Sequence, residues 1–200
     1  VSLNGVKLVQ DLDYSVTYLS NKNVGTAKVV ICGKGVYTIS LTKTFTIRPE
    51  TMASAVITGC KAKYSYTGKQ VKPLIQVVWN GKILRNNTDY TLLYKNNKKR
   101  GSAGIVVTGK GNYSGTLTAS FTIVRASVKK ASVTGLKAVY ARTGKAVKPK
   151  VTVKLGGKKL KKKRDYILSY RKNKKKGTAL LYVKGVGNYS GTKKMKFKIR

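Results

Sequence analysis

Short stretches of alternating apolar and polar residues, separated by turns rich in glycine and asparagine, run along the whole chain. Ile105 and Val107 fall on one face of such a stretch, and Phe121 and Ile123 fall on one face of another. Alternation with a period of two is typical of half-buried β-strands, whereas no stretch of useful length has the periodicity of a helix. The pattern therefore predicts an all-β protein of short antiparallel strands.

Residues 71–79 are predicted to form one of these strands. Pro73 near its start indicates a sheet edge, because proline has no N–H to donate to a neighbouring strand. The strand is followed by Asn80-Gly81, a pair that suits the two positive-φ positions of a tight hairpin turn. Its counterparts are Asn4-Gly5 and Gly156-Gly157, which meet the same demand.

The whole pattern of strands and turns returns at a fixed interval of 76 residues. The interval is marked by three Asp-Tyr pairs, Asp13-Tyr14, Asp89-Tyr90 and Asp165-Tyr166. A fixed period indicates one structural unit copied in tandem. The predicted repeats cover residues 1–48, 49–124 and 125–200. The first is incomplete, since it has no counterpart of residues 49–76, and the chain is therefore expected to be part of a longer polypeptide.

The sequence of the copies resembles the Ig-like tandem repeats of secreted and cell-surface proteins from Gram-positive, Clostridia-like bacteria. The resemblance rests on the segments YTGK, VKP, NGK, DY, VTGKGNYSGT and FTI of residues 49–124 and their counterparts. It implies tandem Ig-like antiparallel β-sandwich modules located outside the cell. In such proteins these modules form stalks or binding arrays, attached to adhesins and to extracellular enzymes alike. The short joints after Ile47 and Ile123 favour a stiff spacer.

Positive charge increases steeply along the chain. Residues 1–48 carry 6 basic and 2 acidic side chains, residues 49–124 carry 11 and 2, and residues 125–200 carry 26 and 1. A field of this strength attracts polyanions, such as anionic cell-wall polymer, acidic glycan, anionic lipid or nucleic acid. It also destabilises the fold by self-repulsion, so we favour a polyanion-binding surface over a merely soluble one.

Two basic clusters flank a predicted strand at residues 165–170. At about 3.3 Å per residue the strand separates them by roughly 20 Å, more than a Debye length of about 8 Å, so they are expected to act as separate contacts. The candidate polyanion-binding residues are Lys158, Lys159, Lys161, Lys162, Lys163, Arg164, Arg171, Lys172, Lys174, Lys175 and Lys176.

The sequence contains few of the side chains that catalysis commonly uses. The chain has no histidine, and residues 125–200 contain a single acid, Asp165. A general base, a paired carboxylate or a zinc site therefore lacks its usual residues. The acids of the Asp-Tyr pairs are predicted to have a structural role, accepting backbone N–H groups in Asx-type turns where the chain enters a strand. No enzyme activity, cofactor or metal site is predicted. The two cysteines, Cys32 and Cys60, are either free or bridged.

The chain is thus expected to be a non-catalytic extracellular repeat region of a bacterial surface or secreted protein. Its basic last repeat is expected to contact anionic cell-wall polymer or acidic glycan. The alternative is an adhesin that binds a host macromolecule, such as mucin glycan, matrix protein or immunoglobulin. Non-specific nucleic-acid binding stands third, because no element that enters a groove of DNA is evident. No apolar run of 18 residues is present, so no transmembrane segment is predicted.

Overall fold

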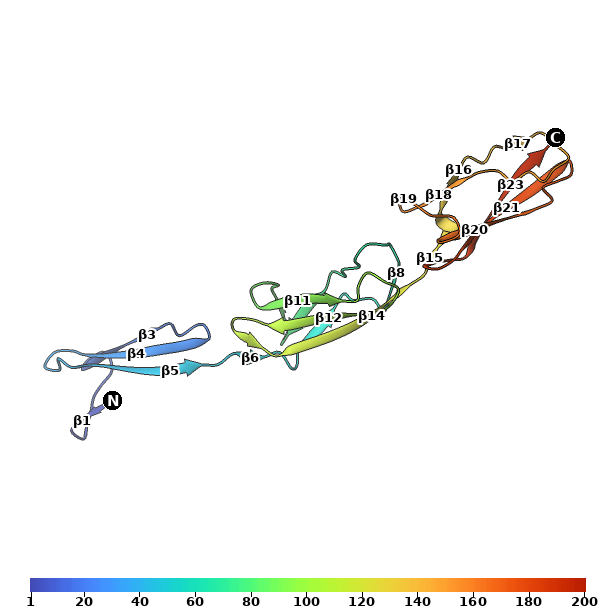
Figure 1. Cartoon of the computed structure of the whole chain (residues 1–200). Coiled ribbons are helices and arrows are strands. Elements are labelled where there is room, and N and C mark those ends of the chain that lie inside the picture. The colour runs from blue at the N-terminus through green and yellow to red at the C-terminus, as the bar shows by residue number, and fades with distance from the viewer. The chain divides into compact units, whose positions relative to one another are not determined.

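The structure is a computed structural model that describes all 200 residues. Its regular elements are β-strands and one short 3-10 helix, η1 (Val128–Lys130) (Figure 1). Most neighbouring strands are antiparallel, in several small sheets. The predicted all-β class is therefore confirmed. None of the structure's helices has the length and apolar character required to cross a bilayer.

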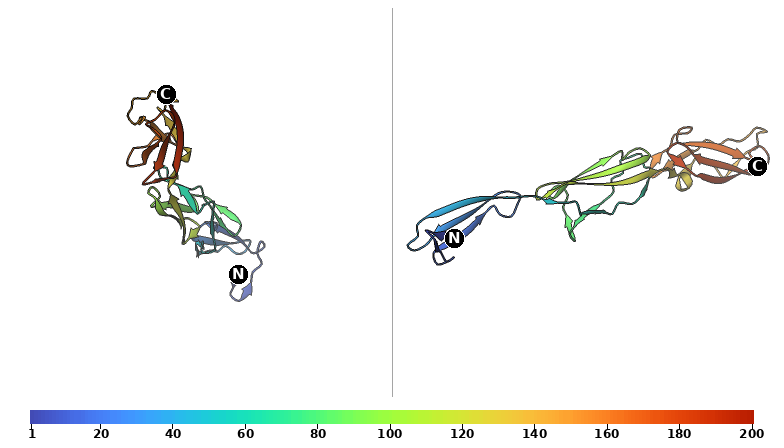
Figure 2. Two further views of the ribbon diagram at one scale, coloured as in Figure 1. Left: turned by 90° about the vertical axis from the view of Figure 1, so that its right-hand side faces the viewer. Right: turned by 90° about the horizontal axis from the view of Figure 1, so that it is seen from below.

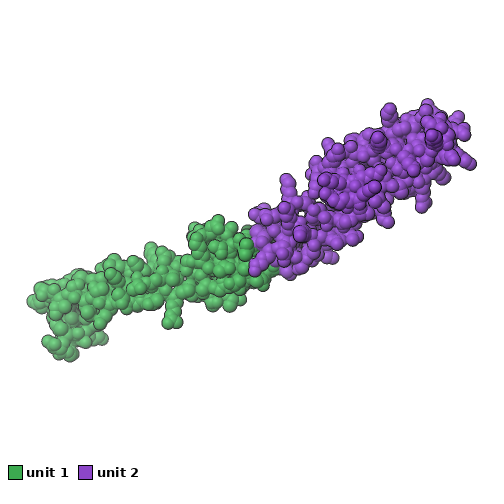
Figure 3. All heavy atoms as spheres, in the orientation of Figure 1, with its two compact units in different colours: residues 1–59, 75–93, 105–119 green, residues 60–74, 94–104, 120–200 purple.

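The contacts of the chain group into two compact units, which Figure 3 shows in different colours. Unit 1 comprises residues 1–59, 75–93 and 105–119, and unit 2 comprises residues 60–74, 94–104 and 120–200. Four strands form a sheet in the order β11-β12-β14-β8: β11 (Tyr90–Lys95), β12 (Gly101–Gly109), β14 (Thr116–Val124) and β8 (Lys63–Ser65). The first three of these strands have residues in both units. The repeat boundaries that the sequence indicates stay predictions.

Unit 1 begins with a hairpin and a three-stranded sheet. The hairpin pairs β1 (Ser2–Leu3) with β2 (Val6–Lys7), and its turn residues Asn4 and Gly5 have φ of 48° and 80°, as the Asn-Gly signal predicts. The sheet is antiparallel, in the order β3-β4-β5: β3 (Tyr14–Leu19), β4 (Gly25–Gly33) and β5 (Ser40–Ile47). Figures 1 and 2 show it as a single layer of strands.

The rest of unit 1 holds two further small sheets. One is a parallel pair, β6 (Glu50–Thr51) and β13 (Tyr113–Ser114). The other is antiparallel, in the order β10-β9-β7: β10 (Lys82–Leu84), β9 (Gln76–Trp79) and β7 (Val56–Thr58).

Because β9 begins only at Gln76, the predicted strand over residues 71–79 is wrong in its first half. Pro73 has no N–H to give to a ladder. The N–H of Val71 donates instead to the carbonyl oxygen of Asn97, at 2.7 Å.

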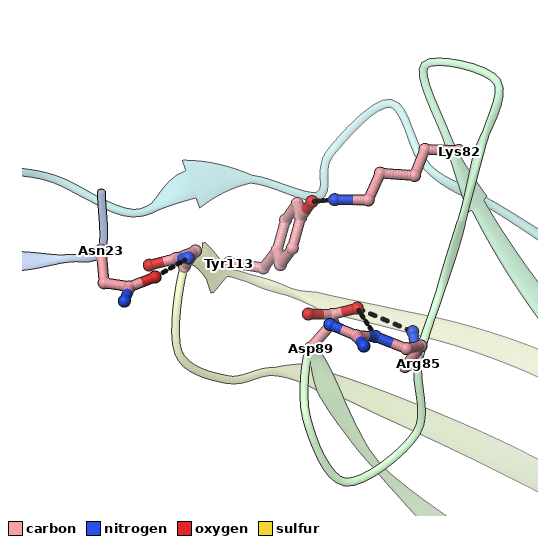
Figure 4. Close-up of polar contacts among 6 residues, drawn as sticks. Asn23, Lys82, Arg85, Asp89 and Tyr113 are labelled. Carbon is pink, nitrogen blue, oxygen red and sulfur yellow. Dashed lines mark hydrogen bonds and ion pairs between the residues drawn. The ribbon is translucent and has the colours of Figure 1, made fainter.

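Polar contacts within unit 1 join the first predicted repeat to the second (Figure 4). The Nδ2 of Asn112 donates to the Oδ1 of Asn23, and the Oδ1 of Asn112 accepts the N–H of Val24, both at 2.8 Å. Beside this contact, the Nζ of Lys82 donates to the hydroxyl of Tyr113 at 3.0 Å. These side chains place the loop at residues 20–24 against the loop at residues 109–113.

Besides β8, unit 2 contains two sheets whose side chains form its core, and a short parallel pair. The smaller sheet is antiparallel, in the order β16-β18-β19: β16 (Ser132–Thr134), β18 (Thr152–Leu155) and β19 (Lys158–Lys159). The larger has the order β17-β23-β21-β20: β17 (Val139–Tyr140), β23 (Thr192–Ile199), β21 (Gly177–Gly185) and β20 (Tyr166–Arg171). The parallel pair is β15 (Ala126–Ser127) and β22 (Tyr189–Ser190).

The core of unit 2 is built from side chains on alternate strand positions. Val153 on β18, Leu181 and Val183 on β21, and Phe197 and Ile199 on β23 are each no more than 2% exposed. They form one cluster because a period of two sends them to the same face of each strand. β20 is an edge strand of its sheet, and its first residue, Tyr166, belongs to the buried cluster.

Both cysteines are free thiols. Cys32 is exposed on β4. Cys60 is partly buried, and burial raises the pKa of its thiol, partly offset by a hydrogen bond from Tyr64. The bridge that the sequence left open is therefore not formed in this structure.

Candidate polyanion-binding groove

A loop closed by Asp165 carries the first basic cluster. The N–H of Asp165 donates to the carbonyl oxygen of Lys161, and its Oδ2 accepts the N–H of Lys161, both at 2.8 Å. The N–H of Lys163 donates to the carbonyl oxygen of Tyr166 at 2.7 Å. Residues 161–165 are therefore fixed as a tight loop immediately before β20.

The same arrangement occurs at the other two Asp-Tyr pairs. The Oδ2 of Asp13 accepts the N–H of Val9, and the Oδ2 of Asp89 accepts the N–H of Arg85, each at 2.8 Å. The carboxylates accept backbone N–H groups at the start of a strand, so the predicted structural role is confirmed. The donor lies four residues before the acid, however, so the loop is not the Asx-type turn that we expected, in which the donor follows the acid.

The guanidinium of Arg164 donates two hydrogen bonds of 3.0 Å to the carboxylate of Asp165, from Nε to Oδ1 and from Nη2 to Oδ2. These bonds lower the pKa of the Asp165 carboxyl, and the N–H of Lys161 and the charges of Arg164 and Lys158 lower it further, while burial opposes the shift. The only acid of residues 125–200 is thus ionised, 5% exposed and paired. It offers little repulsion to an approaching anion.

An open groove of about 800 Å³ lies beside this loop, along β20. Five lysines and no acid line it, and its other lining residues are apolar or aromatic. The lysines are Lys148, Lys150, Lys159, Lys161 and Lys162. The remaining lining residues are Pro149, Val151, Leu160, Tyr166, Leu168 and Tyr170. The groove thus combines a cationic rim with an apolar floor.

Hydrogen bonds hold the far wall of the groove in place, although residues 145–151 form no strand. The hydroxyl of Tyr170 donates to the carbonyl oxygen of Pro149 at 2.8 Å. The Nδ2 of Asn173 donates to the carbonyl oxygen of Val147 at 2.8 Å, and the N–H of Val147 donates to the carbonyl oxygen of Asn173 at 2.7 Å. Burial raises the pKa of the Tyr170 hydroxyl, helped by Tyr140 and Tyr166, so the floor is neutral at physiological pH.

The candidate residues of the first basic cluster do not all lie in the groove. Lys159, Lys161 and Lys162 line the groove. Lys158 points elsewhere, with its Nζ 5.8 Å from the ring centroid of Tyr66. Arg164 is engaged with Asp165. Lys163 adopts the left-handed backbone conformation, with φ of 70°.

The second basic cluster lies at the other end of β20. Its turn forms a separate hollow of about 500 Å³, lined by Lys172, Asn173, Lys174, Lys175, Lys176, Gly177 and Thr178. Arg171 does not line it; its guanidinium lies 5.8 Å from the ring centroid of Tyr182. The two clusters are therefore distinct surfaces within unit 2.

Lys148 and Lys150 line the groove but are not among the candidate residues from the sequence. Their signal was the run Lys148-Pro149-Lys150, in a segment whose fold depends on hydrogen bonds to Tyr170 and Asn173. No group of three or more cysteine, aspartate or glutamate side chains is close enough to hold a metal ion. Comparison with known proteins adds no name to the groove, because no family model, curated protein or solved structure matches the chain.

Proposed function

We propose that the chain is a non-catalytic extracellular repeat region of a Gram-positive surface or secreted protein. In this proposal residues 1–48, 49–124 and 125–200 are tandem Ig-like modules, and the first two act as spacer and display. The last module contacts an anionic polymer of the cell wall. The resemblance of the repeats supports the location, and the charge of residues 125–200 supports the partner.

The groove along β20 is the observation that carries the proposal. Its five lysines have no acidic neighbour in the lining, so a chain of phosphates or carboxylates meets only positive charge. Binding of this kind releases counterions and weakens with salt. For five contacts, a slope of about −0.7 per contact predicts roughly a 100-fold loss of affinity between 50 and 200 mM salt.

The second cluster gives a long polymer a further contact. It lies at the opposite end of the six-residue strand β20, about 20 Å away at 3.3 Å per residue. A polymer that spans both sites gains from the high effective concentration of the second contact. Affinity should therefore rise with polymer length and level off once both clusters are occupied.

The test compares two variants that remove equal charge. The groove variant replaces the five groove lysines by glutamine, and the control replaces five exposed lysines outside it, Lys129, Lys130, Lys184, Lys194 and Lys196. Binding to purified anionic wall polymer is measured at two salt concentrations. We expect the groove variant to lose at least about 10-fold in affinity and much of its salt slope, and the control to lose about 2-fold. Equal losses in both variants would exclude the groove as the contact.

Adhesion to a host macromolecule is the second candidate, and the apolar floor of Leu168 and Tyr170 is the observation that favours it. A protein side chain or a sugar face can fill such a floor, while the rim selects for acidic groups. This candidate predicts an affinity that survives moderate salt. Host glycoprotein and duplex DNA are therefore included beside the wall polymer, and a preference for DNA with a steep salt slope would point to the third candidate.

A further inference from the structure

Three phenylalanines at equivalent positions of the predicted repeats differ sharply in exposure. Phe121 and Phe197 are each 2% exposed, whereas Phe45 is 41% exposed. All three follow the same alternating pattern, which predicts an inward-facing side chain. Phe45 on β5 is therefore an apolar position whose cover is absent from unit 1.

The other two phenylalanines are covered in the same way. The ring of Tyr64 packs edge-on against Phe121 with centroids 5.2 Å apart, and the ring of Tyr140 packs against Phe197 at 5.4 Å. Tyr64 lies on β8, which runs parallel to β14, and Tyr140 lies on β17, which runs parallel to β23. In each case one added parallel strand supplies the aromatic cover.

The added strands also use the same backbone register. Tyr64 is opposite Ile123, and Tyr140 is opposite Ile199. The N–H of Thr122 donates to Ala62, and that of Lys198 donates to Ala138. The position equivalent to Thr122 and Lys198 on β5 is Thr46, at the edge of the β3-β4-β5 sheet. An edge strand presents backbone donors and acceptors to a further strand.

A second side chain marks the same open region. The hydroxyl of Tyr94 donates to the carbonyl oxygen of Pro73, and the hydroxyl of Tyr170 donates to that of Pro149. Tyr18, the equivalent residue on β3, is 57% exposed. The segment that would cover Phe45 and Tyr18 therefore corresponds to residues 61–73, from the strand before Tyr64 to the proline.

We propose that β5 and the exposed face around Phe45 and Tyr18 are a docking site for a polypeptide strand of the repeat's own type. The strand comes from outside residues 1–48 and has the sequence character of residues 61–73. It runs parallel to β5, places a tyrosine edge-on against Phe45 and passes a carbonyl group to Tyr18. Strand addition of this kind draws affinity from backbone hydrogen bonds and specificity from alternate side chains. This proposal is independent of the groove.

The charge of the surface fits such a strand. Residues 61–73 carry four lysines and no acid, and the first predicted repeat has the smallest excess of positive charge. Repulsion between the strand and its site is therefore weaker here than it would be at either later repeat. Edge pairing between two copies of β5 is the competing occupant, and it would leave Phe45 without its tyrosine.

The experiment uses the full chain with the repeat segment supplied in two ways. One arm adds a synthetic peptide with the sequence of residues 61–73. The other places a copy of residues 49–76 directly before Val1, in the way that residues 49–76 precede Val77. Hydrogen exchange of residues 40–47 is measured in both, and we expect the amides of β5 to exchange at least about 10-fold more slowly in the tethered form. In the first control, the tyrosine of the added segment that corresponds to Tyr64 is replaced by alanine. In the second control, the added segment is unchanged and Phe45→Ala is introduced in the chain.

The outcomes separate the occupants. The proposal is supported if the β5 amides exchange more slowly in the tethered form and if either alanine substitution removes this protection. This holds whether or not the free peptide, which binds more weakly, gives measurable binding. Exchange of β5 that is unchanged by the tethered segment overturns it. Protection that appears in the unmodified chain only as its concentration rises, together with dimers in light scattering, assigns the site to a second copy and also overturns the proposal.

Discussion

Two loops 76 residues apart, at residues 85–90 and 161–166, are built alike and charged differently. In each, the acid accepts the N–H of the residue four positions earlier at 2.8 Å, as Figure 4 shows for Arg85 and Asp89. In each, a residue of the loop has positive φ, 67° at Asn87 and 70° at Lys163. The backbone of the loop is therefore independent of the lysines that decorate the second one.

The surroundings of the two loops differ in the same sense. At the positions of the groove lysines Lys150 and Lys159, the residues 76 earlier are Leu74 and Ile83, which are 95% and 56% exposed. Since one fold accepts either an exposed apolar side chain or a lysine there, folding does not require the charge. The positive charge of the groove is therefore separable from the strands and loops that carry it.

Replacing Asp165 by alanine should have the largest effect. The substitution removes the acceptor for the N–H of Lys161 and for both nitrogens of Arg164. Hydrogen bonds to a charged group contribute about 1.5–3 kcal/mol, so we expect a loss of about 2–3 kcal/mol in the local free energy of unfolding. Hydrogen exchange of the β20 amides measures it.

The matched substitution is Asp89→Ala. Asp89 accepts the backbone N–H of Arg85 at 2.8 Å, but its ion pair with the 75% exposed Arg85 side chain is 3.7 Å long. An exposed pair of this kind contributes between about 0 and 1 kcal/mol, so the loss at Asp89 should be smaller. Equal losses at the two acids would mean that the Arg164 fork adds nothing to the second loop.

Making the groove resemble its counterpart should weaken polyanion binding. The double substitution Lys150→Leu and Lys159→Ile removes two of the five groove lysines and introduces the residues found 76 positions earlier. Loss of two contacts predicts roughly a 10-fold lower affinity at 0.1 M salt. The affinity for anionic polymer is measured by titration at fixed salt.

The control for this exchange also introduces the residues found 76 positions earlier. Lys194→Thr and Lys196→Ser remove the same charge from exposed positions of β23 outside the groove. If this control weakens binding as much as the groove exchange does, net charge rather than the groove determines affinity. Unfolding curves of both variants show whether either change disturbs the fold.

Lowering the pH should remove part of the stability that Asp165 provides. The pKa of its carboxyl lies below the ordinary value of 3.8, chiefly because of the hydrogen bonds from Arg164. The ionised form is therefore favoured in the folded state, and its contribution is complete above pH 3.8 and is lost as the pH falls through the folded pKa. We expect the stability difference between the native chain and Asp165→Asn to shrink as the pH is lowered from 5 to about 2. A constant difference would contradict the shift.

The strands that alternation indicates are the part of the fold that the sequence predicts well. Ile105, Val107 and Ile123 are fully buried, and Phe121 is 2% exposed. Local pattern suffices at these positions because a period of two sends the side chains to one face whatever the neighbouring strand is.

The errors arise where distant contacts decide. Residues 71–75 read as a strand, but Val71 bonds to Asn97 and Pro73 bonds through its carbonyl to Tyr94. Phe45 follows the same alternating pattern as Phe121 and Phe197, but it is 41% exposed, whereas they are each 2% exposed. The groove likewise depends on hydrogen bonds that bring residues 147–151 beside β20, so only three of its five lysines were among the predicted site residues.

The smallest expected effect comes from exchanging the positive-φ residues of the two loops, Asn87 and Lys163. Lys163 holds φ of 70°, a conformation that asparagine tolerates better than lysine, and it does not line the groove. Lys163→Asn should therefore raise the free energy of unfolding by about 0.5 kcal/mol, and Asn87→Lys should lower it by a similar amount in the other loop. Chemical denaturation of the two single variants measures both changes. The backbone contributions of the two substitutions are equal and opposite. If the gain in the free energy of unfolding for Lys163→Asn exceeds the loss for Asn87→Lys, the difference measures the additional self-repulsion among the clustered lysines.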